Sequence, residues 1–121
     1  MSAPASHDFT IYQGATMREQ RRLLTGIAPN RVPVDLAGYT GRCQIRLKPS
    51  SPDFLVDMSS ANGGFVLVDA ADGTFALVLS AAVTAALTFK TAVYDIELVA
   101  PDSVVSRVLQ GTVTLSHEVT R

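Results

Sequence analysis

Apolar and polar residues alternate along the second half of the chain, and this period of two restricts the fold more than any other feature. Three runs show it: Thr74 to Leu79, Ala92 to Val99 and Val104 to Ser116. In the middle run, three apolar residues fall on one face and two carboxylates on the other, namely Tyr94, Ile96 and Leu98 against Asp95 and Glu97. Because successive side chains of a strand point to opposite faces, each run predicts a strand with one buried and one solvated face.

The first half of the chain contains further runs of β-type sequence between turn residues. We expect strands over Asp8 to Gln13, Met17 to Thr25, Arg42 to Lys48, Phe54 to Met58 and Phe65 to Val68. Residues 17–25 also show some helical spacing, but the turn-rich segment after them favours a strand. Seven or eight short strands separated by turns are typical of a sandwich or barrel. The predicted fold is all-β: an immunoglobulin-like antiparallel β-sandwich with one short helical turn.

Two segments make this prediction more specific. In the run from Arg42 to Lys48 the apolar face consists of Cys43, Ile45 and Leu47. The five residues 69–73 are rich in aspartate and glycine, which predicts a β-hairpin between the runs on either side.

Two further positions have an expected local role. Ser80 is a suitable N-cap for a helical turn from Ala81 to Leu87, in which Val83 lies one turn before Leu87. Gly111 interrupts the last strand, which predicts either a bulge or a close approach of another backbone.

Length and charge restrict the classes of function. The chain has 121 residues, 47% of them hydrophobic, and a formal net charge of −1. We expect a single domain over residues 8–121, after a flexible N-terminal segment of residues 1–7. The near-neutral charge argues against nucleic-acid and membrane-surface binding, which require a basic excess. The first residues lack the basic start and apolar core of a secretory signal, so we expect a cytoplasmic origin.

Residues that could carry catalysis are isolated from one another. Cys43 lies on the apolar face of a strand, where burial leaves little thiolate. His7 and His117 lie near opposite ends of the chain, and neither has partners at triad or zinc-site spacing. Asp69 and Asp72 lack the other ligands of a calcium loop and suit a turn, where aspartate bonds nearby backbone. We therefore predict no catalytic, cofactor-binding or metal-binding residue.

One cluster of charged residues suggests a function. It consists of Arg18, Glu19, Arg21 and Arg22, with Arg31 nearby. Arginine is enriched at interfaces because its planar guanidinium bonds carboxylates in pairs. The cluster is predicted to contact acidic groups of a neighbouring subunit, and a plain solvated surface is an equally good explanation. The acidic Glu19 and the lack of interleaved aromatic residues argue against contact with DNA.

Five segments of the chain resemble a class of viral proteins. They are Asp-Phe-Thr-Ile-Tyr-Gln-Gly (8–14), Pro-Val-Asp-Leu-Ala-Gly-Tyr-Thr (33–40), Asp-Gly-Thr-Phe (72–75), Leu-Ser-Ala-Ala-Val-Thr-Ala-Ala-Leu (79–87) and Ala-Val-Tyr-Asp-Ile-Glu-Leu (92–98). Over residues 8–121 the chain is similar to small proteins encoded among bacteriophage and prophage tail genes. Those proteins look similar to the N-terminal domain of upper baseplate proteins that hold receptor-binding proteins. Residues 15–22 depart from the pattern, which suggests a contact peculiar to this protein.

The resemblance implies a non-enzymatic virion protein of the tail region, made in the host cytoplasm. Its expected partners are other tail or baseplate proteins, including fibre or receptor-binding subunits, with several copies in a symmetric assembly. Two alternatives stay open: a carbohydrate-binding β-sandwich module, and a decoration protein of the capsid surface or collar. The absence of tryptophan and the presence of only three tyrosines count against sugar binding, because sugar rings usually rest on exposed aromatic faces. An enzyme is the least favoured class.

Overall fold

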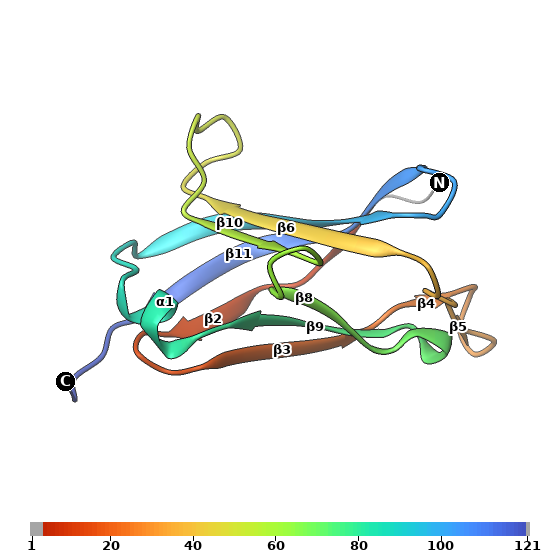
Figure 1. Ribbon diagram of the computed structural model, residues 1–121, viewed down its shortest axis with the longest axis horizontal. Coiled ribbons are helices and arrows are strands. Elements are labelled where there is room, and N and C mark those ends of the chain that lie inside the picture. Colours follow the sequence, from red (N-terminus) through yellow and green to blue (C-terminus); the bar gives the residue numbers. More distant parts are fainter. Residues whose placement is uncertain (1–3, 121) are drawn as a thin grey trace.

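Strands make up most of the regular structure in residues 4–120, which are the residues that the computed structural model describes (Figure 1). The strands are β1 (Ala5–Ser6), β2 (Phe9–Tyr12), β3 (Met17–Arg22), β4 (Leu24–Thr25), β5 (Val32–Pro33), β6 (Thr40–Arg46), β7 (Val56–Ser59), β8 (Phe65–Asp69), β9 (Thr74–Leu79), β10 (Thr91–Val99) and β11 (Val105–Ser116). The helical segments are the 3-10 turn η1 (Ala70–Asp72) and the helix α1 (Ala81–Ala85). The predicted all-β class is confirmed.

Two sheets face each other, and Figure 1 shows them as an upper and a lower layer. The larger sheet has the strand order β1-β11-β10-β6-β7, and β2 also pairs with β11. The smaller sheet has the order β3-β9-β8. Neighbouring strands are antiparallel except for β1 and β2, which run parallel to β11. The hairpin of β4 and β5 precedes β6 in the chain.

The hydrophobic core lies between the sheets and is built by the alternation that the sequence shows. The larger sheet contributes Ile11, Ile45, Tyr94, Ile96, Leu98, Val113 and Leu115 among others, and the smaller sheet contributes Phe65, Phe75, Leu77 and Leu79. The rings of Phe65 and Phe75 stack with their centroids 5.0 Å apart. Tyr94, Ile96 and Leu98, which the alternation places inside, are buried, so this part of the prediction is confirmed.

The predicted strands of the first half are present, with one correction at the end of β6. Residues 17–25 are extended, as β3 and β4, and β8 and β9 form the predicted hairpin. The prediction for Leu47 is wrong: this side chain is 54% exposed, because β6 ends at Arg46. The backbone N–H of Lys48 donates to the hydroxyl oxygen of Ser51 at 3.1 Å. A hydrogen bond to a serine hydroxyl thus replaces the next hydrogen bond between strands.

The N-terminal segment joins the larger sheet from residue 5 onward, through the pairing of β1 with β11. The sequence predicts a flexible segment over residues 1–7, of which residues 1–3 lie outside the described residues. The His7 N–H donates to the Gln110 carbonyl oxygen at 2.9 Å. The close backbone approach predicted at Gly111 is confirmed, because a side chain there would collide with the His7 carbonyl oxygen.

The predicted helical turn forms as α1, which ends at Ala85 rather than at Leu87. Ser80 caps α1 by accepting a hydrogen bond from the Val83 N–H at 3.2 Å. Of the two apolar residues one turn apart, Leu87 is buried and Val83 is 43% exposed, and Thr84 is fully buried. The Thr84 hydroxyl donates to the Ala15 carbonyl oxygen at 2.8 Å and accepts from the Gly14 N–H at 3.1 Å. Thr84 therefore ties α1 to the turn between β2 and β3.

Replacing Thr84 by valine is expected to lower the free energy of unfolding by about 1–3 kcal/mol. Valine has nearly the same shape, so the loss reports the hydrogen bonds of the Thr84 hydroxyl rather than a cavity. Urea unfolding followed by circular dichroism measures it. The control is Thr88→Val, because Thr88 is exposed. Equal unfolding midpoints for the two variants would contradict the anchoring role of Thr84.

Candidate functional site

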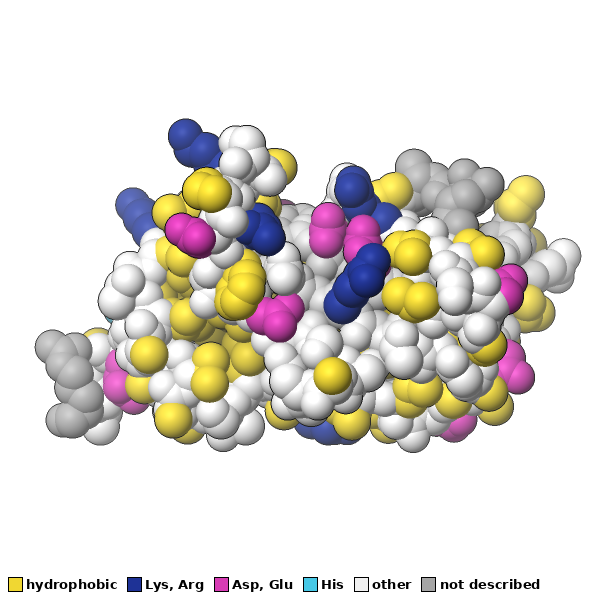
Figure 2. All heavy atoms as spheres, turned by 45° about the horizontal axis from the view of Figure 1, so that its top comes forward, with side chains coloured by type: hydrophobic (Ala, Val, Ile, Leu, Met, Phe, Trp, Pro, Cys, Tyr) yellow, Lys and Arg dark blue, Asp and Glu magenta, His cyan; other side chains and the backbone are white. Residues whose placement is uncertain are grey.

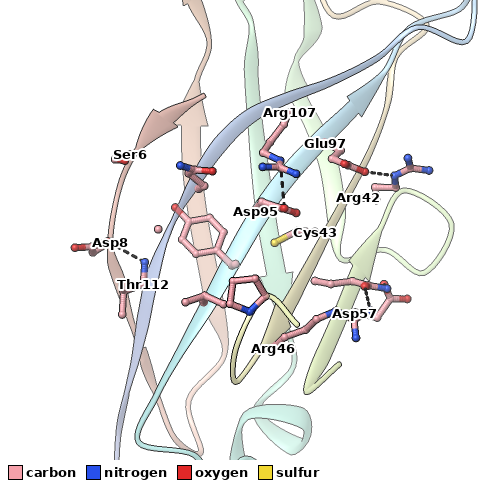
Figure 3. A pocket seen from close by; sticks show the side chains of 16 residues that line it. Ser6, Asp8, Arg42, Cys43, Arg46, Asp57, Asp95, Glu97, Arg107 and Thr112 are labelled. Carbon is pink, nitrogen blue, oxygen red and sulfur yellow. Dashed lines mark hydrogen bonds and ion pairs between the residues drawn. The ribbon is translucent and has the colours of Figure 1, made fainter. Parts of the chain in front are cut away.

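The outward face of the larger sheet is hollowed into a groove with a volume of about 850 Å³. Its lining comes from β1, β6, β7, β10 and β11, from Asp8 just before β2, and from Pro49 in the loop between β6 and β7 (Figure 3). This loop, residues 47–55, stands above the sheet in Figure 1. Figure 2 shows basic and acidic side chains close together along the same face. We call this feature the outer groove.

A row of polar side chains crosses the floor of the outer groove from edge to edge. Residues paired across neighbouring strands share a face of the sheet. The pairs of this sheet place one outward residue of each strand in a single row: Asp57, Gln44, Asp95, Gln110 and Ser6. The row thus alternates carboxylate and amide groups and ends on a hydroxyl.

Ion pairs and hydrogen bonds hold the charged groups of the outer groove. Arg42 Nε lies 2.8 Å from Glu97 Oε1, and Arg107 Nε lies 3.4 Å from Asp95 Oδ2. Arg46 donates to Gln44 Oε1 at 2.7 Å and to the Ser51 carbonyl oxygen at 3.0 Å. Gln44 in turn donates to Asp57 Oδ1 at 3.2 Å. Each of the three arginines of the lining therefore has an acceptor inside or beside the groove.

A β-bulge places Arg107 in this network. Leu109 lies opposite Ile96, but Arg107 lies opposite Glu97, which leaves Val108 as the extra residue of β11. Without the bulge, Arg107 would share the buried face of Val113, because the two are separated by an even number of residues. The sequence predicts a bulge or a close approach at Gly111, and the structure has the close approach there and the bulge at Val108.

Asp95 lies at the centre of the groove floor. Partial burial raises the pKa of this carboxyl above its usual value, with Arg107 acting in the opposite direction and Glu97 adding to the rise. The Asp95 charge is thus only partly compensated by its long contact with Arg107.

Cys43 and Tyr94 lie beneath the groove floor, on the buried face. Cys43 is 1% exposed, as the sequence predicts. Burial, with smaller effects of Asp95 and Asp57, raises the pKa of its thiol far above the usual value, so the reactive thiolate is suppressed. Burial likewise raises the pKa of Tyr94 to about 12, and its hydroxyl donates to the His7 carbonyl oxygen.

The structure does not bring the five predicted interface residues together. All but Arg31 lie on β3, an edge strand of the smaller sheet, and alternation divides them between its two faces. Glu19 and Arg21 share the face of buried Met17 and pair with each other at 2.9 Å. Arg18 and Arg22 point to the opposite face, where Arg22 pairs with Asp72 at 2.7 Å.

Arg31 lies apart from β3, in the hairpin between β4 and β5. Its side chain is exposed. The five charged residues therefore belong to three separate features: the Glu19–Arg21 ion pair, the opposite face of the edge strand β3, and the hairpin between β4 and β5.

The other candidate residues are the two histidines and the turn aspartates. His7 and His117 are exposed. Asp69 caps η1 by accepting from the Asp72 N–H at 3.3 Å, as expected of turn aspartates. Within residues 4–120, no three histidine, cysteine, aspartate or glutamate side chains are grouped so as to hold a metal ion. None of the helices in these residues has the length and apolar character needed to cross a membrane.

Comparison with models of protein families gives no match to this chain, and a search of curated proteins gives none either.

Proposed function

We propose that the protein is a non-enzymatic structural component of a bacteriophage particle. In this proposal it is an immunoglobulin-like β-sandwich that occurs in several copies in the tail or baseplate region and joins neighbouring subunits. The sequence resemblance to tail-region proteins supports the location. The arrangement of strands and of exposed apolar side chains supports the mode of action.

The strand order supports the immunoglobulin-like assignment. In such domains one sheet contains strands B, E and D, and the facing sheet contains G, F and C, with C′ added in the variable type. The order β3-β9-β8 facing β11-β10-β6-β7 follows that scheme in chain sequence. Domains of this architecture present loops at both ends of the sandwich, which suits a module that connects two neighbours.

Exposed apolar side chains at one end of the molecule carry the proposal. They lie in the β4–β5 hairpin and at the turn between β10 and β11, which Figure 1 shows at the same end, and they are Leu24, Ile27, Val32, Val104 and Val105. Ile27 is 86% exposed. Grouped apolar residues of this kind mark protein interfaces. The exposed guanidinium of Arg31 lies in the same hairpin and suits an acidic group of the neighbour.

A second apolar surface lies beyond the other end of β6. The loop of residues 47–55 exposes Leu47, Phe54 and Leu55, by 54%, 51% and 36%. An adaptor requires two separate contact surfaces, and the two ends of β6 lead to one each. The many small contacts of a symmetric assembly then add through avidity.

The surroundings of the nucleophile candidate support the non-enzymatic part of the proposal. Cys43 is buried, and its raised pKa keeps the thiol protonated. His7 and His117 are exposed, and within residues 4–120 neither is joined to the buried Cys43 by a hydrogen bond or ion pair.

Particle incorporation tests the proposal. Phage particles carrying Ile27→Asp are expected to contain several-fold fewer copies of the protein, measured by quantitative mass spectrometry of purified particles. The isolated variant should stay folded, with a stability change within about 0.5 kcal/mol, because Ile27 makes no core contact. The control is Val119→Asp, because Val119 is 92% exposed and outside both surfaces. Unchanged copy number with Ile27→Asp would remove this end from the interface, and absence of the wild-type protein from mature particles would overturn the proposal.

A further inference from the structure

The shape of the outer groove suits an elongated ligand that lies across the strands. Its central polar row runs over five neighbouring strands, from Asp57 to Ser6. With strands spaced about 4.8 Å apart, the row is roughly 19 Å long. The loop 47–55 stands above the sheet on which the groove lies (Figure 1). A chain of several repeating units therefore has space, whereas a compact small molecule would leave most of the row empty.

Two ion pairs, Arg42–Glu97 and Arg107–Asp95, already join charges of the groove. Three arginines, Arg42, Arg46 and Arg107, stand beside four carboxylates, those of Asp8, Asp57, Asp95 and Glu97. A strongly ionic ligand would have to separate pairs such as Arg42–Glu97, with their contact of 2.8 Å. The lining also has no large excess of either charge that would attract a highly charged ligand. A neutral ligand leaves the pairs in place.

Unused hydrogen-bonding capacity is nevertheless abundant along the row. A carboxylate offers about four acceptor positions and a guanidinium five N–H donors. The contact between Asp95 and Arg107 uses one oxygen and one nitrogen. The amide of Gln110 and the hydroxyl of Ser6 add groups that both donate and accept. A line of mixed donors and acceptors matches hydroxyl groups, since each hydroxyl also donates and accepts.

The groove is also preorganised. Gln44, Asp95 and Gln110 stand on the three inner strands of the sheet. Arg46, Gln44 and Asp57 fix one another through hydrogen bonds. The bulge at Val108 turns Arg107 into the groove, and bulges frequently occur where a side chain is re-aimed at a functional site. Val93 and Pro49 in the lining supply apolar contact for the C–H faces of a ring. This preorganisation reduces the conformational entropy that is lost on binding.

We propose that the outer groove binds a neutral, hydroxyl-rich chain, an oligosaccharide, that crosses the strands along the row from Asp57 to Ser6. Recognition rests on hydrogen bonds from rigidly held planar groups rather than on a stacked aromatic ring. This site goes beyond the assembly role and belongs to the domain itself. Its test therefore uses the isolated full chain and is independent of particle incorporation.

The test is an NMR titration of the ¹⁵N-labelled chain with four neutral hexasaccharides: cellohexaose, maltohexaose, mannohexaose and chitohexaose. At least one is expected to give saturable shifts confined to β6, β7, β10, β11 and residues 5–8. The double variant Ser6→Ala with Gln110→Ala should weaken that affinity about tenfold, as expected for the loss of one or two hydrogen bonds. The matched control is Gln20→Ala, because Gln20 is an exposed strand residue of the other sheet, and it should bind as the wild type does.

Three outcomes would overturn the proposal. The first is that none of the four hexasaccharides gives saturable shifts. The second is that the shifts lie outside the groove, or that the double variant binds as well as Gln20→Ala. The third is that an acidic hexasaccharide, hexagalacturonate, binds more tightly than every neutral one with an affinity that falls steeply as salt is added. A negative result for particle incorporation changes none of these readouts, so the two proposals fail independently.

Discussion

Replacing Ile45 by aspartate is expected to lower the free energy of unfolding by more than about 4 kcal/mol. A loss of this size removes a large part of the stability of an ordinary domain. Ile45 is fully buried and lies on β6, between Val56 of β7 and Tyr94 of β10. A carboxylate there would have no cation or hydrogen-bond donor to replace water. The protein would have to bury the charge or protonate the carboxyl, and both cost free energy. Urea unfolding or thermal melting measures the loss.

The matched control is Leu47→Asp, two residues further along the same run. The alternation of the sequence alone gives Ile45 and Leu47 the same buried face and hence the same expected cost. In the structure Leu47 is 54% exposed beyond the end of β6, so its replacement should change stability by less than about 0.5 kcal/mol. Similar losses for both variants would contradict the position at which β6 ends.

This pair of residues shows where the sequence pattern stops being sufficient. The alternation predicts the buried and exposed faces of β10 correctly, because the residues of β10 themselves determine both faces. The position at which β6 ends depends instead on competition between strand pairing and a local hydrogen bond to a side chain. The Ser51 hydroxyl oxygen accepts a hydrogen bond from the Lys48 N–H, and the loop forms in place of one further hydrogen bond between strands. A local hydrogen bond of this kind leaves no trace in the period of apolar residues.

The outer groove could be predicted only in part. The same alternation indicates that Gln44 and Asp95 point to solvent, and that is where they lie. Their meeting in one row depends on which strands are neighbours and on the register between them, and neither is written in the sequence of a single strand. The bulge at Val108 shifts the alternation of β11 by one residue. Without the bulge, the alternation alone would put Arg107 in the core.

The charged cluster of residues 18–22 shows what sequence proximity alone does not reveal. Neighbours in sequence suggest one surface, but on a strand they point alternately to two faces. Arg18 and Arg21 are thereby separated, and Arg21 pairs with Glu19 at 2.9 Å. The position of β3 at a sheet edge offers a second physical reason for the charges, since charged side chains on an edge strand discourage pairing with another chain. Testing Arg18 separately from Arg21 is therefore necessary in any interface experiment.

Replacing Gly111 by alanine is expected to detach the N-terminal segment from β11 and to lower the free energy of unfolding by about 3 kcal/mol. A Cβ at this position would collide with the His7 carbonyl oxygen, which is backbone and has no rotamer to adopt. That oxygen accepts the hydrogen bond of the Tyr94 hydroxyl. Moving it leaves a buried hydroxyl without a partner, and also strains the bond from the Thr112 N–H to Asp8 at 2.8 Å. The loss therefore exceeds that of the added methyl group alone.

Hydrogen exchange gives this last prediction a local readout. The His7 amide, which donates to the Gln110 carbonyl oxygen at 2.9 Å, should exchange faster in Gly111→Ala, while amides at the centre of β10 stay protected. The control is Gly63→Ala. Its Cβ would have open space, but its φ of 79° costs an alanine about 1 kcal/mol of backbone energy. If Gly111→Ala loses no more stability than Gly63→Ala and keeps the His7 amide protected, β1 is not held by contact with Gly111. The segment before β2 would then have to be bound to the sheet in another way, and Ser6 could not be placed at the end of the polar row.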